Sequence, residues 1–251
     1  MKVVKQILDF YINTSIHVAI AVFSLVQITK LQLNISTNSN LDYFIFFGTI
    51  LGYNFLKYCV VFWNRIFTLK KNFEILLITL ISFYGIVFYF FRLSSNIQIE
   101  FIKIGFLILI YPLIRKFGLI KMVYVSFCLT LITVYIIEIN HYYIYFTQRF
   151  LIIFCLLIPL EICDLETDSK TIKTLPKIIG IQNLKFLGYC LLVAFCFLKL
   201  KLNFDITIDI VIAIIIAIVI FFSNKNLTKY YSSFWVESLP VVWWVLLDFT
   251  K

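Results

Sequence analysis

The chain has 251 residues, of which 62% are hydrophobic, 19% aromatic and only 14% charged, with a net charge of +9. Soluble domains are roughly 45–50% apolar, so this composition excludes an ordinary soluble domain. Apolar runs of about twenty residues recur along the chain, and backbone groups in lipid must pair internally. Barrel strands would need only about ten residues with strict alternation. The sequence therefore predicts an all-α, polytopic membrane helical bundle.

Nine apolar segments are predicted to span the membrane, joined by short connections, so that residues 1–251 form a single transmembrane domain. In chain order they are 8–29, 42–63, 73–91, 98–114, 122–140, 144–164, 183–202, 205–223 and 233–249. The first segment is longer than a signal-peptide core and no small-residue cleavage site follows it. We therefore expect it to remain as the first span.

Orientation follows from the lysines and arginines of the short loops. Thirteen fall on one side of the predicted spans: Lys2, Lys5, Arg65, Lys70, Lys71, Arg115, Lys116, Lys121, Lys170, Lys173, Lys177, Lys225 and Lys229. The other side has five, with two more whose side is open. The sequence thus predicts a cytoplasmic N-terminus and an outer C-terminus, in a bacterial inner membrane. Because topology and attraction to anionic membrane lipid account for the positive charge, no nucleic-acid partner is expected.

Four carboxylates lie within eight residues at the end of the sixth apolar run, in "EICDLETDSKTIKTLPKIIG". If the helix continues, Glu161, Asp164 and Asp168 share one face, spaced i, i+3 and i+7. Two such charges about 6 Å apart repel by roughly 3 kcal/mol at an effective dielectric constant of 20. A cation is therefore expected beside them: a divalent metal, nearby lysines or a proton. All-oxygen ligands favour Mg²⁺ or Ca²⁺ over zinc, and Mg²⁺ commonly bridges carboxylates to substrate phosphates. The alternative is a solvated helix end whose carboxylates face the lysines of the following loop.

The stretch resembles the second aspartate-rich motif of the UbiA-type membrane prenyltransferases. Glu161, Asp164 and Asp168 take its acidic places, and Thr174-Leu175-Pro176 and Gly180 follow. "YPLIRK" is similar to the family's Tyr-x-x-x-Lys element, with Tyr111 and Arg115 in its key places. The nine predicted spans also agree with the family fold. The resemblance implies Mg²⁺ held by Glu161, Asp164 and Asp168, and a prenyl diphosphate contacted by Asn54, Arg65, Tyr111, Arg115 and Lys173. Lys57 is a further candidate for contact with the diphosphate.

The family's first motif, N-x-x-x-D-x-x-x-D, is incomplete in this chain. In "GYNFLKYCVVFWNR", Asn54 takes the place of the family asparagine, but Tyr58 and Phe62 stand where aspartates are expected. Lys57 lies beside the first missing aspartate, and a lysine within a membrane helix is usually paired. It is expected to contact the diphosphate directly, to form a salt bridge with Asp164 or Asp168, or to extend to the interface.

Two main functions are consistent with these residues. The first is a Mg²⁺-dependent membrane transferase that moves an isoprenoid from a prenyl diphosphate to an unknown lipophilic acceptor, with Asp164 and Asp168 as its catalytic residues. The second is a catalytically silent UbiA-like protein that binds a lipid or a partner subunit. A transporter is a third interpretation, although no repeat or pair of broken helices is visible in the sequence. His17 is expected to be a structural, hydrogen-bonded residue or to face the cavity.

Overall fold

The computed structural model describes residues 2–36, 38–63, 73–115, 117–138, 143–165, 174–200, 207–228 and 230–250. Within these ranges every regular element is helical and no strand occurs. The elements are α1 (Lys2–Asn13), α2 (Ile16–Leu33), α3 (Ser39–Trp63), α4 (Phe73–Phe90), α5 (Ser95–Ile114), α6 (Gly118–Thr130), η1 (Leu131–Tyr135), α7 (Tyr143–Cys163), α8 (Leu175–Ile179), α9 (Ile181–Leu200), α10 (Thr207–Phe222), η2 (Tyr231–Val236) and α11 (Leu239–Asp248).

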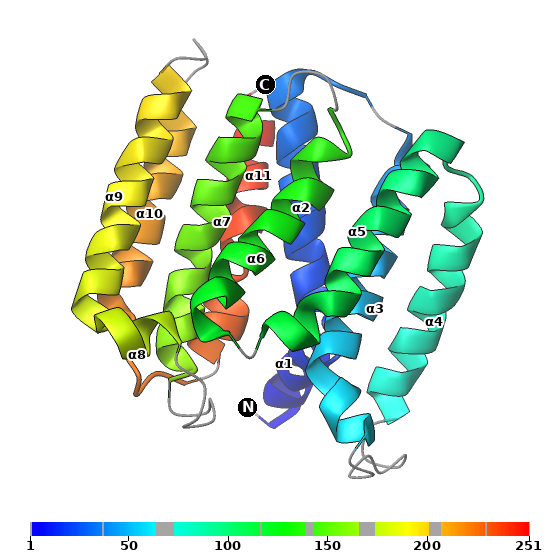
Figure 1. Cartoon of the computed structure of the whole chain (residues 1–251), viewed down its shortest axis with the longest axis horizontal. Helices are drawn as coiled ribbons and strands as arrows, with labels where there is room; N and C mark the ends of the chain where they lie inside the picture. Colours follow the sequence, from blue (N-terminus) through cyan, green and yellow to red (C-terminus); the bar gives the residue numbers. More distant parts are fainter. Residues whose placement is uncertain are drawn as a thin grey trace.

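The long helices run up and down alongside one another, with the N-terminus and α8 at one end of the bundle and the C-terminus at the other (Figure 1). We refer to these as the α8 end and the opposite end. Among the described residues, α2, α4, α5, α7 and α9 are long and apolar enough to cross a membrane. The all-helical prediction is therefore confirmed for the described residues, and these five segments are compatible with membrane spans. Shorter apolar helices occupy 120–135 and 207–222.

Helix α2 packs in the middle of the bundle and joins two apolar cores. Leu25 and Ile28 contribute to a core built mainly from α7, α9, α10 and α11. Val22 and Val26, on another side of α2, contribute to a second core with α3, α5 and the residues that follow η1. In lipid, packing of this kind rather than water exclusion holds helices together, so close contacts matter.

Two glycines allow such close contacts. A Cβ atom at Gly85 of α4 would lie 2.7 Å from the Phe47 ring on α3, and one at Gly188 of α9 would lie 2.7 Å from Ile158 on α7. Both distances are shorter than carbon atoms tolerate. The α3–α4 and α7–α9 pairs therefore approach at positions where only glycine fits without a shift.

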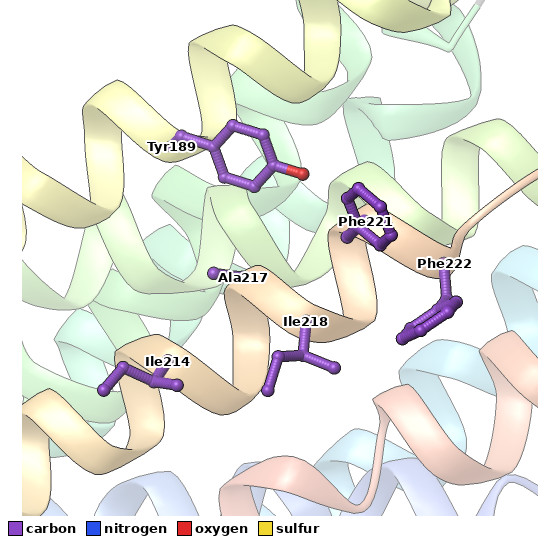
Figure 2. Close-up of a pocket in the computed structure, with 6 residues that line it drawn as sticks. All are labelled: Tyr189, Ile214, Ala217, Ile218, Phe221 and Phe222. Atoms are coloured by element: carbon purple, nitrogen blue, oxygen red, sulfur yellow. The ribbon is translucent and has the colours of Figure 1, made fainter.

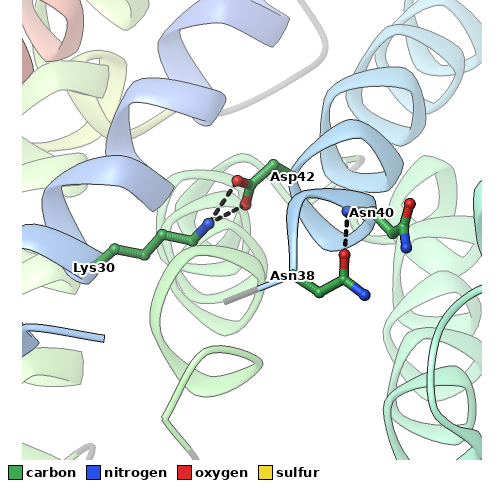
Figure 3. A network of polar contacts seen from close by, with 4 residues as sticks. All are labelled: Lys30, Asn38, Asn40 and Asp42. Carbon is green, nitrogen blue, oxygen red and sulfur yellow. Dashed lines mark hydrogen bonds and ion pairs between the residues drawn. The ribbon is translucent and has the colours of Figure 1, made fainter. Parts of the chain in front are cut away.

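Polar contacts fix the opposite end of the α2–α3 pair (Figure 3). The Lys30 ammonium donates to both oxygens of Asp42, at 2.6 and 2.5 Å. The Asn38 side chain accepts a hydrogen bond from the backbone N–H of Asn40, 3.0 Å away, just where α3 begins. Asn34 ends α2 in the left-handed conformation, with φ of 52°. These contacts set the turn that reverses the chain between α2 and α3.

The first predicted span, 8–29, is two helices rather than one. Helix α1 ends at Asn13 and α2 begins at Ile16, with Ser15 in the left-handed region at φ 63°. The chain here contains neither glycine nor proline, so local sequence does not require the break. Its cause lies in α3, as described below.

Candidate functional site

Polar side chains from three helices and the η2–α11 junction come together toward the α8 end. The Tyr53 hydroxyl on α3 interacts electrostatically with Glu237, then with Tyr111, Asp164 and Arg115. These partners lie on the residues before α11, on α5 and just after α7. Three residues predicted from the sequence, Tyr111, Arg115 and Asp164, are therefore brought into one neighbourhood.

Lys57 belongs to the same group of residues. Glu237 interacts electrostatically with the Lys57 ammonium and also with Asp164. The Lys57 side chain is exposed and its ammonium lies 5.3 Å from the centre of the Tyr58 ring. We call Tyr53, Lys57, Tyr111, Arg115, Asp164 and Glu237 the polar site. When all four groups are ionised, the positive charges of Lys57 and Arg115 equal the negative charges of Asp164 and Glu237. A multiply charged anion bound here would therefore need additional cations to neutralise it.

Asn54, predicted to contact substrate, is instead surrounded by protein groups. It is 3% exposed. Its Oδ1 accepts a hydrogen bond from Ser15 at 2.6 Å. Its Nδ2 donates to the Thr14 carbonyl at 3.2 Å and to the Thr79 hydroxyl at 3.0 Å. The amide thus ties the α1–α2 break to α3 and α4.

Two neighbours of Asn54 complete this clamp on the end of α1. The Tyr58 hydroxyl donates to the Asn13 carbonyl at 2.8 Å, and Lys57 Nζ donates to the Ile12 carbonyl at 3.3 Å. With Asn54 bound to Thr14, three consecutive carbonyls receive side-chain donors from one face of α3. The last carbonyls of a helix have no partner within it, so these donors satisfy groups that would otherwise be costly to bury. Tyr58, at the first missing aspartate position, acts here as a helix cap.

A further contact holds α1 near η2. The Tyr230 hydroxyl donates to Asp9 Oδ1 at 2.7 Å. This hydrogen bond to a carboxylate stabilises the protonated phenol and raises the pKa of Tyr230. Helix α1 is therefore attached at both its Asp9 turn and its C-terminal end.

Glu161, a predicted metal ligand, pairs with a lysine. Lys121 Nζ lies 2.6 Å from Glu161 Oε1, and both side chains are largely buried, at 13% and 7% exposure. One oxygen of this carboxylate is therefore held by an ammonium from α6. Asp164, by contrast, follows the last turn of α7 and is exposed. The other predicted residues here, Arg65, Asp168 and Lys173, lie outside the described residues.

Tyr111 is positioned by aromatic packing. Its ring stacks on that of Tyr124 with centroids 6.3 Å apart. The Tyr124 hydroxyl donates to the Leu107 carbonyl at 2.7 Å.

His17 is buried and held by protein groups. It is 2% exposed, its Nε2 is 3.0 Å from the Phe234 carbonyl, and its ring stacks on Phe234. The interpretation of His17 as a hydrogen-bonded structural residue is the one its contacts favour.

Glu237 and Tyr53 were not identified from the sequence. Glu237 lies inside the predicted span 233–249, in a stretch with no motif of its own. An acidic side chain inside an apolar run is costly in a membrane and usually functional, and that signal was available. Tyr53 gave no comparable signal, because tyrosines are common in this chain.

A second polar cluster lies deep in the bundle, nearer the opposite end. Lys199 Nζ on α9 pairs with Asp209 Oδ2 on α10 at 2.8 Å, and each side chain is 2% exposed. Trp243 on α11 donates to Asp209 Oδ1 at 3.0 Å. The Arg149 guanidinium on α7 lies 5.0 Å from the centre of the Trp243 ring and donates to the Thr29 hydroxyl at 2.9 Å. This cluster links five helices and includes none of the predicted site residues.

The fold and the polar site define a class: an all-helical protein with five helices long and apolar enough to cross a membrane and a charged site toward one end of its bundle. Comparisons with known proteins do not narrow this class, since no family model, curated protein or solved structure gives a significant match. Within the described residues, no three histidine, cysteine, aspartate or glutamate side chains form a metal-binding group.

Proposed function

We propose that the chain is a UbiA-type, nine-span membrane prenyltransferase-like protein that transfers an isoprenoid from a prenyl diphosphate to a lipophilic acceptor. The observation that carries this proposal is the polar site itself. The resemblance selected Tyr111, Arg115 and Asp164 from separate stretches of sequence, and Lys57 was selected as a lysine within an apolar helix. All four are electrostatic neighbours of Tyr53 or Glu237. Positive charge, hydroxyls and a carboxylate in one neighbourhood suit a diphosphate.

Four side chains of the polar site bind the diphosphate in this proposal. Arg115 and Lys57 donate hydrogen bonds to diphosphate oxygens, with arginine suited to two at once. Tyr53 and Tyr111 orient the same group through their hydroxyls. When bound, Mg²⁺ would neutralise the leaving diphosphate as the allylic C–O bond ionises. The protein's own contribution is electrostatic, since donors fixed in place stabilise charge as it develops.

In this proposal Asp164 is the principal Mg²⁺ ligand among the described residues. Asp164 is exposed, so substrate oxygens and water can share its cation. Protein sites often hold Mg²⁺ with only one or two carboxylates plus substrate phosphates. Glu161 contributes less in this arrangement because Lys121 holds one of its oxygens. Asp168 remains the predicted second ligand.

The α8 end is the cytoplasmic end in this proposal, and the membrane is the bacterial inner membrane. The support is the excess of lysine and arginine in the connections assigned to that side, thirteen against five. A soluble prenyl diphosphate head group would then enter from the cytoplasm, while its isoprenoid tail stays in lipid.

The alternative function, a catalytically silent UbiA-like protein, is favoured by a specific set of contacts. Asn54, Lys57 and Tyr58, which cover the first-motif region, all donate to carbonyls at the end of α1. Side chains whose donors bind backbone carbonyls of the same protein have a structural role. In this case the polar site would bind a lipid head group or a partner without ionising a substrate.

The test is binding of a non-hydrolysable prenyl diphosphate analogue to the purified, full-length protein, with and without Mg²⁺. We expect Mg²⁺-dependent binding in the wild type and its loss in Asp164→Ala/Asp168→Ala. The double variant Glu100→Ala/Asp248→Ala is a matched control, because it removes two carboxylates outside the polar site. Mg²⁺-dependent binding that survives in the Asp164/Asp168 variant would contradict the proposal, and the absence of binding in the wild type would favour the silent protein.

Lys57→Ala separates two roles for this lysine. If Lys57 contacts the diphosphate, the variant binds the analogue more weakly at every Mg²⁺ concentration. If Lys57 instead neutralises the carboxylates, the variant binds Mg²⁺ more tightly in the absence of the analogue. Glu237→Gln provides the complementary measurement, because it removes the carboxylate that interacts with both Lys57 and Asp164.

A further inference from the structure

An apolar groove runs between α9 and α10, away from the polar site. It has a volume of about 320 Å³. Figure 2 shows Tyr189 reaching from α9 toward Phe221 on α10, with Ala217 and Ile218 along the same helix. Ile214 and Phe222 complete the lining. Ile218, Phe221 and Phe222 each expose half or more of their surface, so the groove opens outward.

A polar pocket of about 550 Å³ lies at the α8 end of the same two helices. Lys185 and Lys225 line it together with a set of amide and hydroxyl side chains, namely Gln182, Asn183, Ser223, Asn224 and Asn226. None of these lining residues is acidic. The backbone N–H groups of the first turn of α9 also begin here, and a helix N-terminus favours an anion.

The groove and the pocket adjoin one another along α9 and α10. Phe221 and Phe222 line the groove, and Ser223 and Asn224, the next residues, line the pocket. On α9, Lys185 lies one turn before Tyr189 on the same face. Lys185 Nζ donates to the Phe221 carbonyl at 2.7 Å, which places it at the junction. An ammonium has three donors, so this contact leaves two for a ligand.

We propose that this surface is a binding site for one anionic phospholipid, with an acyl chain in the α9–α10 groove and the phosphate in the pocket at Lys185 and Lys225. Between Ile214 and Phe222 the groove follows about 12 Å of helix, close to the roughly 15 Å hydrocarbon depth of one leaflet. The pocket then falls at head-group level. Charge complementarity selects an anionic head group, and the apolar continuation selects a lipid rather than a soluble phosphate.

Lipid binding here is independent of the proposed transferase activity. No residue of the polar site lines either the groove or the pocket. The two proposals are therefore tested by different variants, and either can fail alone.

The experiment titrates delipidated, full-length protein in detergent with phosphatidylglycerol or phosphatidylcholine and counts bound lipids by native mass spectrometry. We expect tighter binding of phosphatidylglycerol. Lys185→Gln and Lys225→Gln should each reduce this preference by roughly fivefold, the effect of one lysine near an anionic lipid. Ala217→Leu fills the groove and should weaken both lipids alike. Lys177→Gln and Cys190→Leu are matched controls, since both residues are exposed and line neither feature.

Three results would overturn the proposal. Equal affinity of the wild type for the two lipids would mean that lipid covers this surface without selection of its head group. Losses in the control variants equal to those in Lys185→Gln would mean that net charge alone attracts lipid. Displacement of phosphatidylglycerol by millimolar inorganic phosphate, with no effect of Ala217→Leu, would identify a soluble-anion site instead.

Discussion

Replacing Asp209 by asparagine tests the buried cluster most directly. At 2.8 Å from Lys199, the carboxylate attracts the ammonium by about 6 kcal/mol at an effective dielectric constant of 20. The Arg149 guanidinium is also attracted to the Asp209 carboxylate. Asn keeps the size of the side chain and an acceptor for Trp243, so the change removes mainly charge. Breaking a buried pair from one side costs about 3–5 kcal/mol, and we expect Asp209→Asn to destabilise the protein by that amount.

The assay is reversible unfolding in mixed micelles, followed by tryptophan fluorescence. Trp243 donates to Asp209 and therefore reports on this region. Lys199→Met/Asp209→Leu should recover most of the loss, because it removes both charges together. Glu100→Gln is the matched control: it breaks the 2.7 Å pair with Lys103, whose side chain is 63% exposed, and should cost under about 1 kcal/mol. If Asp209→Asn costs no more than this control, the buried cluster does not stabilise the bundle as argued.

Further variants test packing, capping and the pairing of Glu161. Tyr58→Phe removes the donor to the end of α1 and should lower stability by about 1–3 kcal/mol in the same assay; an unchanged midpoint would mean that water replaces the phenol. Gly85→Ala places a methyl against the Phe47 ring and should cost about 1–3 kcal/mol, whereas Gly105→Ala, which meets no neighbour, should have little effect. Lys121→Met leaves Glu161 without its ammonium and should lower the thermal midpoint; recovery on adding Mg²⁺ would show that Glu161 binds the metal after all.

Hydropathy located the helices well because lipid imposes the length of each apolar run. The segments predicted at 73–91 and 144–164 correspond to α4 and α7, at Phe73–Phe90 and Tyr143–Cys163. The prediction of nine spans and of a UbiA-like arrangement goes further than the five helices that meet the criteria for a membrane span. It remains a prediction.

The break between α1 and α2 could not be predicted, because residues far away in the sequence cause it. The run 8–29 has no helix-breaking residue, yet Asn54 on α3 binds both Thr14 and Ser15. A hydropathy profile averages residues that are close in the sequence, so it contains no information about a hydrogen bond from a distant helix. The same limitation applies to the buried pair between Lys121 and Glu161, in which each residue alone resembles an ordinary loop or helix-end charge.

The candidate site was only partly predictable. Family resemblance selected Tyr111, Arg115 and Asp164, which are electrostatic neighbours of Tyr53. It gave no indication of Glu237, which comes from a part of the chain without a recognised motif. It also predicts a substrate contact for Asn54, which remains a prediction; in the structure its amide oxygen and nitrogen bind protein groups.

The broken first helix has an electrical consequence for Lys57. A helix C-terminus carries a partial negative charge of about half an electron, and Lys57 contacts the Ile12 carbonyl in the last turn of α1. Part of the countercharge for this lysine is therefore backbone dipole, which does not titrate. A carboxylate such as Glu237 loses its charge on acidification, whereas the partial charge of the Ile12 carbonyl remains as long as α1 stays folded.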